Sequence, residues 1–285
     1  MIKKGRMISR ITDEEKSTLT AAEQRLLTYL TKDSLISTNR LREIYNSKKI
    51  ASPSYFKIVV SSLIKKKIFL QIKKGLYYVT MGEAYDEFLL GQYLFGGYIG
   101  FSTALWLHGL KTEMPSVCYV AVYKGKKTKK IGRMLFKSVS LGEKAIGAAY
   151  IDKYRVSTKA KTFFDCFLIP KYAGGFQQIL YSLSVADMTA ADWNEFLDYI
   201  KKFGSSSMVQ RVGYVFSILR RINAKKVPNF LISELRKELE RKGPVITTLD
   251  PTIKAKGRFV SEWKIYDNVG EKIFGSLHVF GGVEL

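Results

Sequence analysis

The stretch SPSYFKIVVSSLIKKKIFLQIKKGLYYV, residues 52–79, decides the fold of the N-terminal part of the chain. It begins with Ser52-Pro53, a helix-start signal, because serine caps the first turn and proline fits the first helical position. Apolar residues then recur at helical spacing, which predicts a helix over about residues 53–67 with one face in the core. That core face consists of Phe56, Val59, Val60, Leu63 and Ile64.

Two short runs rich in β-branched and aromatic residues follow this helix. They cover residues 68–72 and 76–79 and flank the basic turn Lys73-Lys74-Gly75. Short β-rich runs around a glycine-containing turn predict a β-hairpin.

Two further helices are expected before residue 52. Thr20 and Glu23 fit a capping box at the start of a helix that continues to about Lys32. Ser37 or Thr38 is placed to cap a second helix, in which apolar residues again recur at helical spacing. Three short helices followed by a hairpin is the element order of a winged helix-turn-helix domain, and we expect this domain over residues 1–82.

The outward face of the third helix has the side chains that DNA recognition uses. Hydroxyls can reach base edges or phosphates in the major groove, and Ile58 can contact a thymine methyl. Lys73 and Lys74 at the hairpin turn would contact the phosphate backbone. The predicted DNA-contacting residues of the helix and its start are Ser52, Ser54, Tyr55, Lys57, Ile58, Ser61, Ser62 and Lys65. The alternative is a protein-interaction module with an incidental basic surface.

The charge distribution favours a polyanionic partner for the N-terminal part. The chain of 285 residues has a formal charge of +22, which favours nucleic acid or an anionic membrane surface. Residues 1–80 hold 17 Lys and Arg against 6 Asp and Glu, a net of +11. The remaining 205 residues also carry +11, so the charge is much denser at the N-terminus, as a nucleic-acid-binding domain there would produce.

The cysteine and histidine content argues against a metal or disulfide framework. Cys118 and Cys166 lie far apart in apolar surroundings without a CxxC pair, and His108 and His278 lie near no cysteine pair. We therefore expect no metal, no cofactor and a reducing, cytoplasmic location.

Two segments bear on targeting and membrane insertion. Lys3, Lys4 and Arg6 are not followed by an apolar region, which argues against a secretory signal. Residues 88–110 carry no formal charge and are long enough to span a bilayer. They contain several glycines and polar residues, so we expect a buried turn and a core helix there and no membrane span.

Residues 83–285 are expected to form a mixed α/β region, which gives an overall α+β fold. We first expect a linking helix over about 83–93 and a short helix that Gly109 ends. Strands are expected after them, near 117–123, 134–139 and 148–155. Helices are expected near 158–168, 176–183, 192–203, 206–221 and 230–242. A further division of this region near residue 175 is an alternative.

A basic loop follows the first of these strands. It contains Lys124, Lys126, Lys127, Lys129 and Lys130. The loop is either a solvated hairpin tip or a second element that contacts DNA phosphates or a partner, since a run of charge alone does not distinguish the two.

Several short motifs of the second region resemble those of AbiEi-type antitoxins. The family's "SAL…HGL…P" segment is resembled by residues 100–110, which read GFSTALWLHGL and are followed by Pro115. Thr103 stands where the family usually has a serine. TKAKTFFD over 158–165, followed by PKYAGG over 170–175, is similar to its "AKT…D…P…GG" stretch. LDP over 249–251 and Trp263 are similar to its C-terminal "LDP…W" pattern.

The resemblance implies an antitoxin that is also a transcriptional autorepressor. Its winged helix would bind inverted repeats in the double-stranded DNA of its own promoter. The remainder would neutralise a nucleotidyltransferase-like toxin without forming a stable complex, as part of abortive phage defence.

The sequence carries little that indicates catalysis, and we expect no enzyme. No Walker-type phosphate loop, GxSxG or HExxH motif occurs. His108 lies in an apolar helix and is interpreted as a hydrogen-bonded core histidine, and Asp165 as a polar group that anchors a helix. The alternative function is a metal-dependent nuclease, in which Asp250 and Glu262 would bind the metal and Lys264 would approach a phosphate.

Overall fold

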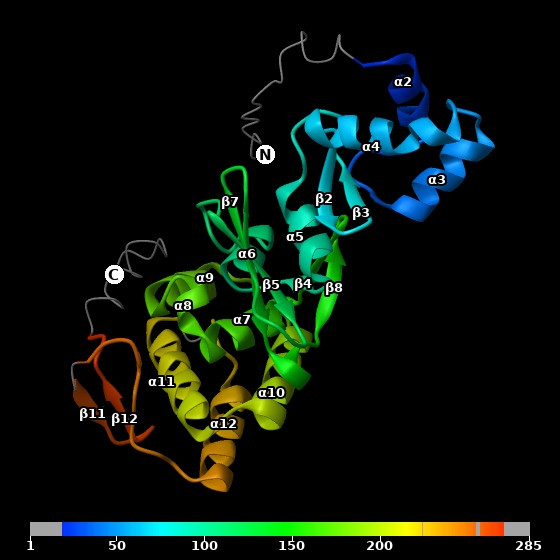
Figure 1. The fold of residues 1–285 in the computed structure, drawn as a ribbon. Helices are drawn as coiled ribbons and strands as arrows, with labels where there is room; N and C mark the ends of the chain where they lie inside the picture. The colour runs from blue at the N-terminus through cyan, green and yellow to red at the C-terminus, as the bar shows by residue number, and fades with distance from the viewer. Residues whose placement is uncertain (1–18, 224, 255–256, 271–285) are drawn as a thin grey trace. The chain divides into compact units, whose positions relative to one another are not determined.

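The protein is described here by a computed structural model, in which residues 19–223, 225–254 and 257–270 are placed well enough to describe (Figure 1). The chain divides into two compact units, residues 1–96 and 97–285. Helices and several sheets occur together, which confirms the predicted α+β class. Lys3, Lys4, Arg6 and His278 lie outside the described residues.

The first unit begins with two short helices joined by a strand. The helix α2 (Ala21–Leu27) has the predicted capping box between Thr20 and Glu23, but it ends well before Lys32. Residues 28–34 form turns that lead into β1 (Leu35–Ser37) and then α3 (Thr38–Ser47). The Ser37 side chain accepts the Arg40 backbone N–H and so caps α3, as predicted.

Residues 52–79 form a helix and a hairpin. The helix starts as a 3-10 turn, η1 (Pro53–Tyr55), and becomes α-helical only in α4 (Phe56–Lys65). The Ser52 side chain makes no capping bond, contrary to the sequence interpretation. Of the five predicted core residues, Phe56, Val59, Val60 and Leu63 are buried, and Ile64 is half-buried and packs against the same core.

A small antiparallel sheet packs with these helices (Figure 1). The strands β2 (Phe69–Lys73) and β3 (Leu76–Val79) form the predicted hairpin, and β1 pairs with β3, so the order is β1-β3-β2. The helix α5 (Glu87–Phe95) contacts β2, and the Tyr93 ring lies 5.9 Å from that of Tyr78. The first unit therefore includes residues 83–96, which the sequence predicts as the start of the second domain.

The second unit is built on a mixed six-stranded sheet with the order β6-β7-β5-β4-β9-β8. The pairs β5–β7 and β4–β9 are parallel, and the other neighbours are antiparallel. Gly97, just before β4, lies so close to β5 that a Cβ there would be 2.0 Å from the Ala121 carbonyl oxygen, which requires glycine. The strands are β4 (Tyr98–Ile99), β5 (Val117–Val122), β6 (Thr128–Ile131), β7 (Met134–Ser140), β8 (Ala148–Ile151) and β9 (Tyr154–Ser157).

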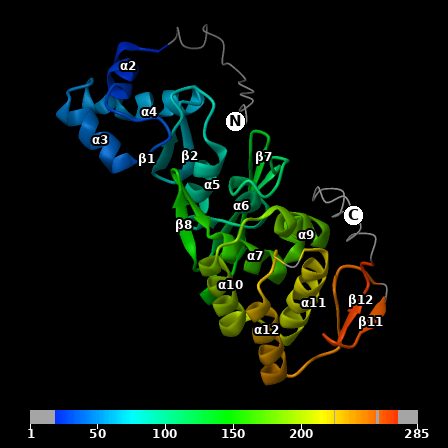
Figure 2. The same ribbon diagram turned by 180° about the vertical axis from the view of Figure 1, so that it is seen from behind.

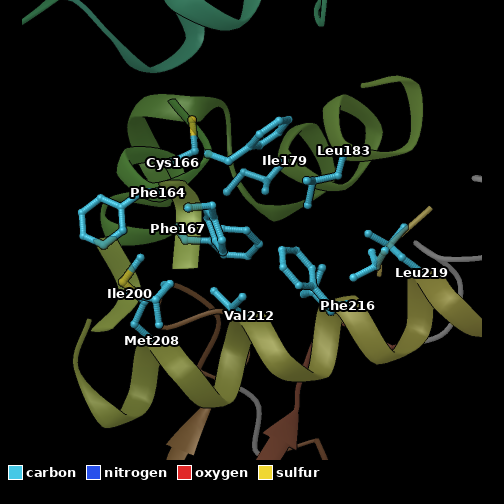
Figure 3. Close-up of a cluster of buried hydrophobic side chains, with 14 of the residues drawn as sticks. Phe164, Cys166, Phe167, Ile179, Leu183, Ile200, Met208, Val212, Phe216 and Leu219 are labelled. Carbon is cyan, nitrogen blue, oxygen red and sulfur yellow. The ribbon is translucent and has the colours of Figure 1, made fainter. Parts of the chain in front are cut away.

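A helical core follows the sheet in sequence. Thr158 caps α7, whose aromatic side chains face α9, α10 and α11 (Figure 3). Phe167 of α7 lies edge-on to Phe216 of α11, with 6.2 Å between ring centroids. The helices are α6 (Phe101–Leu107), α7 (Lys159–Leu168), α8 (Pro170–Ala173), α9 (Phe176–Val185), α10 (Ala190–Phe203), α11 (Ser206–Ile222) and α12 (Asn229–Lys242).

A three-stranded sheet near the C-terminus packs on α11 (Figure 2). It consists of β10 (Thr247–Thr248), β11 (Arg258–Val260) and β12 (Ile265–Asp267). Between β11 and β12 the fully buried Trp263 fills the space over Gly213, where an added Cβ would lie 2.1 Å from its ring. The Trp263 indole N–H donates to the Ser217 hydroxyl at 2.9 Å, so this tryptophan anchors the sheet to the helix.

The uncharged stretch 88–110 contains all of α5 except its first residue, together with β4 and α6, and is mostly buried. Within the described ranges, no helix has both the length and the apolar character needed to cross a membrane.

Candidate nucleic-acid interface

The predicted DNA-contacting residues form the outward face of η1 and α4. Seven of the eight are exposed, and Ser62 is half-buried. Ile58 is 56% exposed and Tyr55 39%, so two large apolar side chains lie in solvent beside hydroxyls and lysines. An α-helix with its opposite face in the core and such a face outward can enter a major groove.

Two of the serines contact each other at the start of this face. The hydroxyl oxygens of Ser52 and Ser54 lie 2.8 Å apart. Because the Ser52 side chain makes no cap, its hydroxyl stays at the surface. Each hydroxyl keeps hydrogen-bonding capacity for a base edge or a phosphate.

The hairpin turn brings Lys73 and Lys74 to the start of α3. Gly75 has φ +75°, which glycine adopts readily, and its carbonyl accepts the Thr38 backbone N–H at 2.9 Å. Both lysines are exposed. The turn that carries both lysines therefore lies next to the N-terminal turn of α3, where the helix dipole also attracts anions.

The structure adds residues of α3 that the sequence analysis did not select. Asn39, Arg40 and Arg42 are exposed on this helix. The guanidinium of Arg42 lies 5.1 Å from the centre of the Phe56 ring, which places it beside the start of α4. Arg40 forms an ion pair with Glu43. Both arginines are visible in the sequence, but only the packing of α3 against α4 brings Arg42 near Phe56.

The candidate face consists of residues 52–65, the turn 73–75 and the exposed side chains at the start of α3. Residues 52–65 and 73–75 contain no acidic side chain. The nearby acid Glu23 is buried and paired with Lys66. The helix α4 and the hairpin turn therefore present only positive charge on this face, which favours contact with a phosphate backbone, while Arg40 at its α3 edge is paired with Glu43.

The second basic segment lies in the other unit and is a strand as well as a loop. Residues 124–130 are predicted as one loop, but from Thr128 they form β6, an edge strand that pairs with β7. Four of its five lysines are exposed and Lys129 is half-buried. The Lys127 backbone N–H donates to the Ser138 hydroxyl at 2.7 Å, which fixes the end of the loop. Lysines on an edge strand also discourage pairing with another chain.

His108 and Asp165, which the sequence suggests are structural groups, both have hydrogen-bonding partners inside the protein. His108 Nε2 lies 2.7 Å from the Ser157 carbonyl oxygen, to which it donates because a carbonyl only accepts. Burial lowers the pKa of His108. Asp165 is fully buried, pairs with Lys161 and accepts the Tyr98 hydroxyl at 3.2 Å, so it connects α7 to β4.

The carboxylates of the nuclease alternative also have partners. Asp250 accepts the backbone N–H and the hydroxyl of Thr252. Glu262 pairs with Arg236 of α12, and the buried Trp263 separates it from Lys264. Among the described residues, no group of three histidine, cysteine or acidic side chains is arranged to hold a metal ion.

Comparison of the sequence with models of known protein families gives no match, and no curated protein matches it either. The resemblance to AbiEi-type antitoxins therefore rests on the motifs named above.

Proposed function

We propose that the protein is a DNA-binding transcriptional regulator whose first unit is a winged helix-turn-helix domain. The element order α2-β1-α3-α4-β2-β3, with the sheet order β1-β3-β2, supports this proposal. The observation that carries it is the candidate face: an exposed helix surface and a basic hairpin turn that lies at the start of α3.

In this proposal α4 enters the major groove of double-stranded DNA. Its hydroxyls and Ile58 contact base edges, which supplies sequence specificity. Lys73 and Lys74 contact phosphates on the flanking backbone and supply affinity that is independent of sequence. Arg42, placed over Phe56, is available to a phosphate near the start of α4.

On the motif resemblance, we further propose that the protein represses its own promoter at inverted repeats and acts as an antitoxin. The toxin would be nucleotidyltransferase-like and would not form a stable complex with it. This function requires the protein in the cytoplasm, where the buried thiols of Cys118 and Cys166 stay reduced.

The test is binding of the full chain to the DNA upstream of its own gene. Fluorescence anisotropy and footprinting should show a protected inverted repeat, bound more tightly than a shuffled duplex of equal length. Equal affinity for both duplexes, without a footprint, would contradict the regulator. Cleavage of the duplex in Mg²⁺ that is lost in Glu262→Ala would favour the nuclease.

A further inference from the structure

A cavity of about 550 Å³ lies in the second unit between the last turns of α11 and the first half of α12. Three guanidinium groups line it, from Arg220 and Arg221 of α11 and Arg236 of α12. Glu262 is the one carboxylate in the lining, so positive charge is in excess. Such a cavity favours an anionic ligand.

Two of these arginines are held in place by the protein. Arg220 donates to the carbonyl of Val227 in the segment that joins the two helices. Arg236 pairs with Glu262 and lies 5.9 Å from the centre of the Trp263 ring. Donors held in this way lose little freedom when a ligand arrives, which favours binding.

Arg221 differs from its two neighbours. It is exposed, and its guanidinium makes no hydrogen bond or ion pair with any of the described residues. The guanidinium presents donors in a planar fork that matches the oxygens of a phosphate. Arg221 is therefore the arginine of this cavity most available to a ligand.

The neutral lining complements the arginines. Ser217, Asn229 and Ser233 supply hydroxyl and amide groups, and Ile232 supplies an apolar wall. Asn229 begins α12, whose N-terminus has no side-chain cap. The volume falls within the range of small-molecule sites and exceeds what inorganic phosphate alone would fill.

We propose that this cavity binds a small organic phosphate, with its phosphate group on Arg220 and Arg221 and its organic part toward Ile232. This site belongs to the second unit and does not depend on DNA binding by the first. Its partner is identified by chemistry alone: a phosphate monoester attached to a group of sugar or nucleoside size.

The test is isothermal titration calorimetry of the full chain with inorganic phosphate, ribose 5-phosphate, adenosine 5′-monophosphate and unphosphorylated adenosine. We expect at least one organic phosphate to bind 1:1 and more tightly than inorganic phosphate, and adenosine not to bind. Arg221→Ala should weaken that binding about tenfold or more, the effect of losing a charge-assisted hydrogen bond. Its melting temperature should stay unchanged because Arg221 makes no hydrogen bond or ion pair within the described part of the chain.

The matched control is Lys225→Ala, which removes an exposed positive charge close in sequence but outside the lining. It should bind like the unmodified protein. Equal weakening by both variants would mean general charge attraction and would overturn the site, as would a failure of both organic phosphates to bind at millimolar concentration. A third outcome would also overturn the proposal: the small phosphates do not bind, but a single-stranded oligonucleotide does, and Arg221→Ala abolishes its binding. The cavity would then be assigned to a nucleic-acid backbone.

Discussion

Glu23 of α2 and Lys66, which caps the end of α4, form an ion pair with 2.6 Å between the lysine nitrogen and a carboxylate oxygen. The same oxygen accepts the Thr20 backbone N–H at 2.7 Å. One carboxylate thus caps α2 and ties it to the helix that carries the candidate face. Burial acts to raise the pKa of Glu23, but hydrogen bonds from Lys66, Ser62 and Thr20 outweigh it and lower this pKa below its usual 4.5.

Replacing Lys66 with alanine is expected to destabilise the protein by about 1–3 kcal/mol, because the buried carboxylate loses its partner. A carboxylate with a lowered folded-state pKa contributes stability that is present above its unfolded pKa and lost as the pH falls through the folded one. The difference between variant and unmodified protein in urea unfolding should therefore be large at pH 7 and shrink below pH 4.5. Lys65→Ala, at an exposed position, is the control, and an equal effect from it would argue against the pair.

The double variant Lys73→Ala, Lys74→Ala should weaken binding to all duplexes by a similar factor. If each lysine contacts one phosphate, the slope of log affinity against log salt should decrease by about 1.8, since each contact contributes about 0.9. Anisotropy titrations over a range of salt concentrations measure this slope. Lys48→Ala, Lys49→Ala removes the same charge near the other end of α3 and should change the slope less. The same slope for both pairs would argue against a specific role for the hairpin turn.

Ser54→Ala and Ser61→Ala should change sequence preference more than overall affinity. Loss of a base-edge hydrogen bond is expected to reduce discrimination at one position of the operator by about 1–3 kcal/mol. Binding to a set of duplexes with single base changes measures this. Ser47→Ala is a suitable control because that hydroxyl already donates to the Ile44 carbonyl of its own helix. Unchanged preference in both α4 variants would contradict a base-reading role for this face.

If β6 and the loop before it make a second contact to DNA phosphates, the triple variant Lys126→Ala, Lys127→Ala, Lys130→Ala should lower affinity for all sequences and decrease the salt slope. Anisotropy titrations provide the measurement. A normal slope would assign these exposed lysines to the solvated edge of the sheet.

Lys161 and Asp165 form an ion pair in which neither side chain is exposed. Removing one partner, as in Lys161→Met or Asp165→Leu, should cost about 3–5 kcal/mol because it leaves a buried charge alone. The double variant should cost less than the sum of the two single variants, since it leaves neither charge unpaired. Denaturant unfolding of all four proteins tests this, and strictly additive losses would show that the two charges do not interact.

Much of the local structure follows from residues close together in sequence. The Thr20–Glu23 capping box and the Thr158 cap form within three residues, and so does the turn at Gly75. The apolar face of α4 follows from the spacing of Phe56, Val59, Val60 and Leu63, because helical geometry alone puts these side chains on one side. Exposure of the opposite face follows from the same geometry.

The short strand β1 could not be predicted in this way. Leu35–Ser37 is too short for an alternating pattern, and it is a strand because β3 is available to pair with it. Residues 128–131 likewise look like part of a basic loop until β7 pairs with them. Strand pairing is a long-range contact, and local propensity does not encode it.

The sequence by itself thus determined the capped starts of α2, α3 and α7, which faces are apolar, and that the hairpin turn is basic. Only the tertiary structure decided which distant groups meet: Gly75 with Thr38, Arg42 with Phe56, and Lys66 with Glu23. The arginine-lined cavity has the same origin, since Arg221, Arg236 and Glu262 come together only when α12 and the last sheet pack against α11. Capping bonds and helical faces are satisfied within a few residues, whereas burial and charge pairing depend on the whole packed chain.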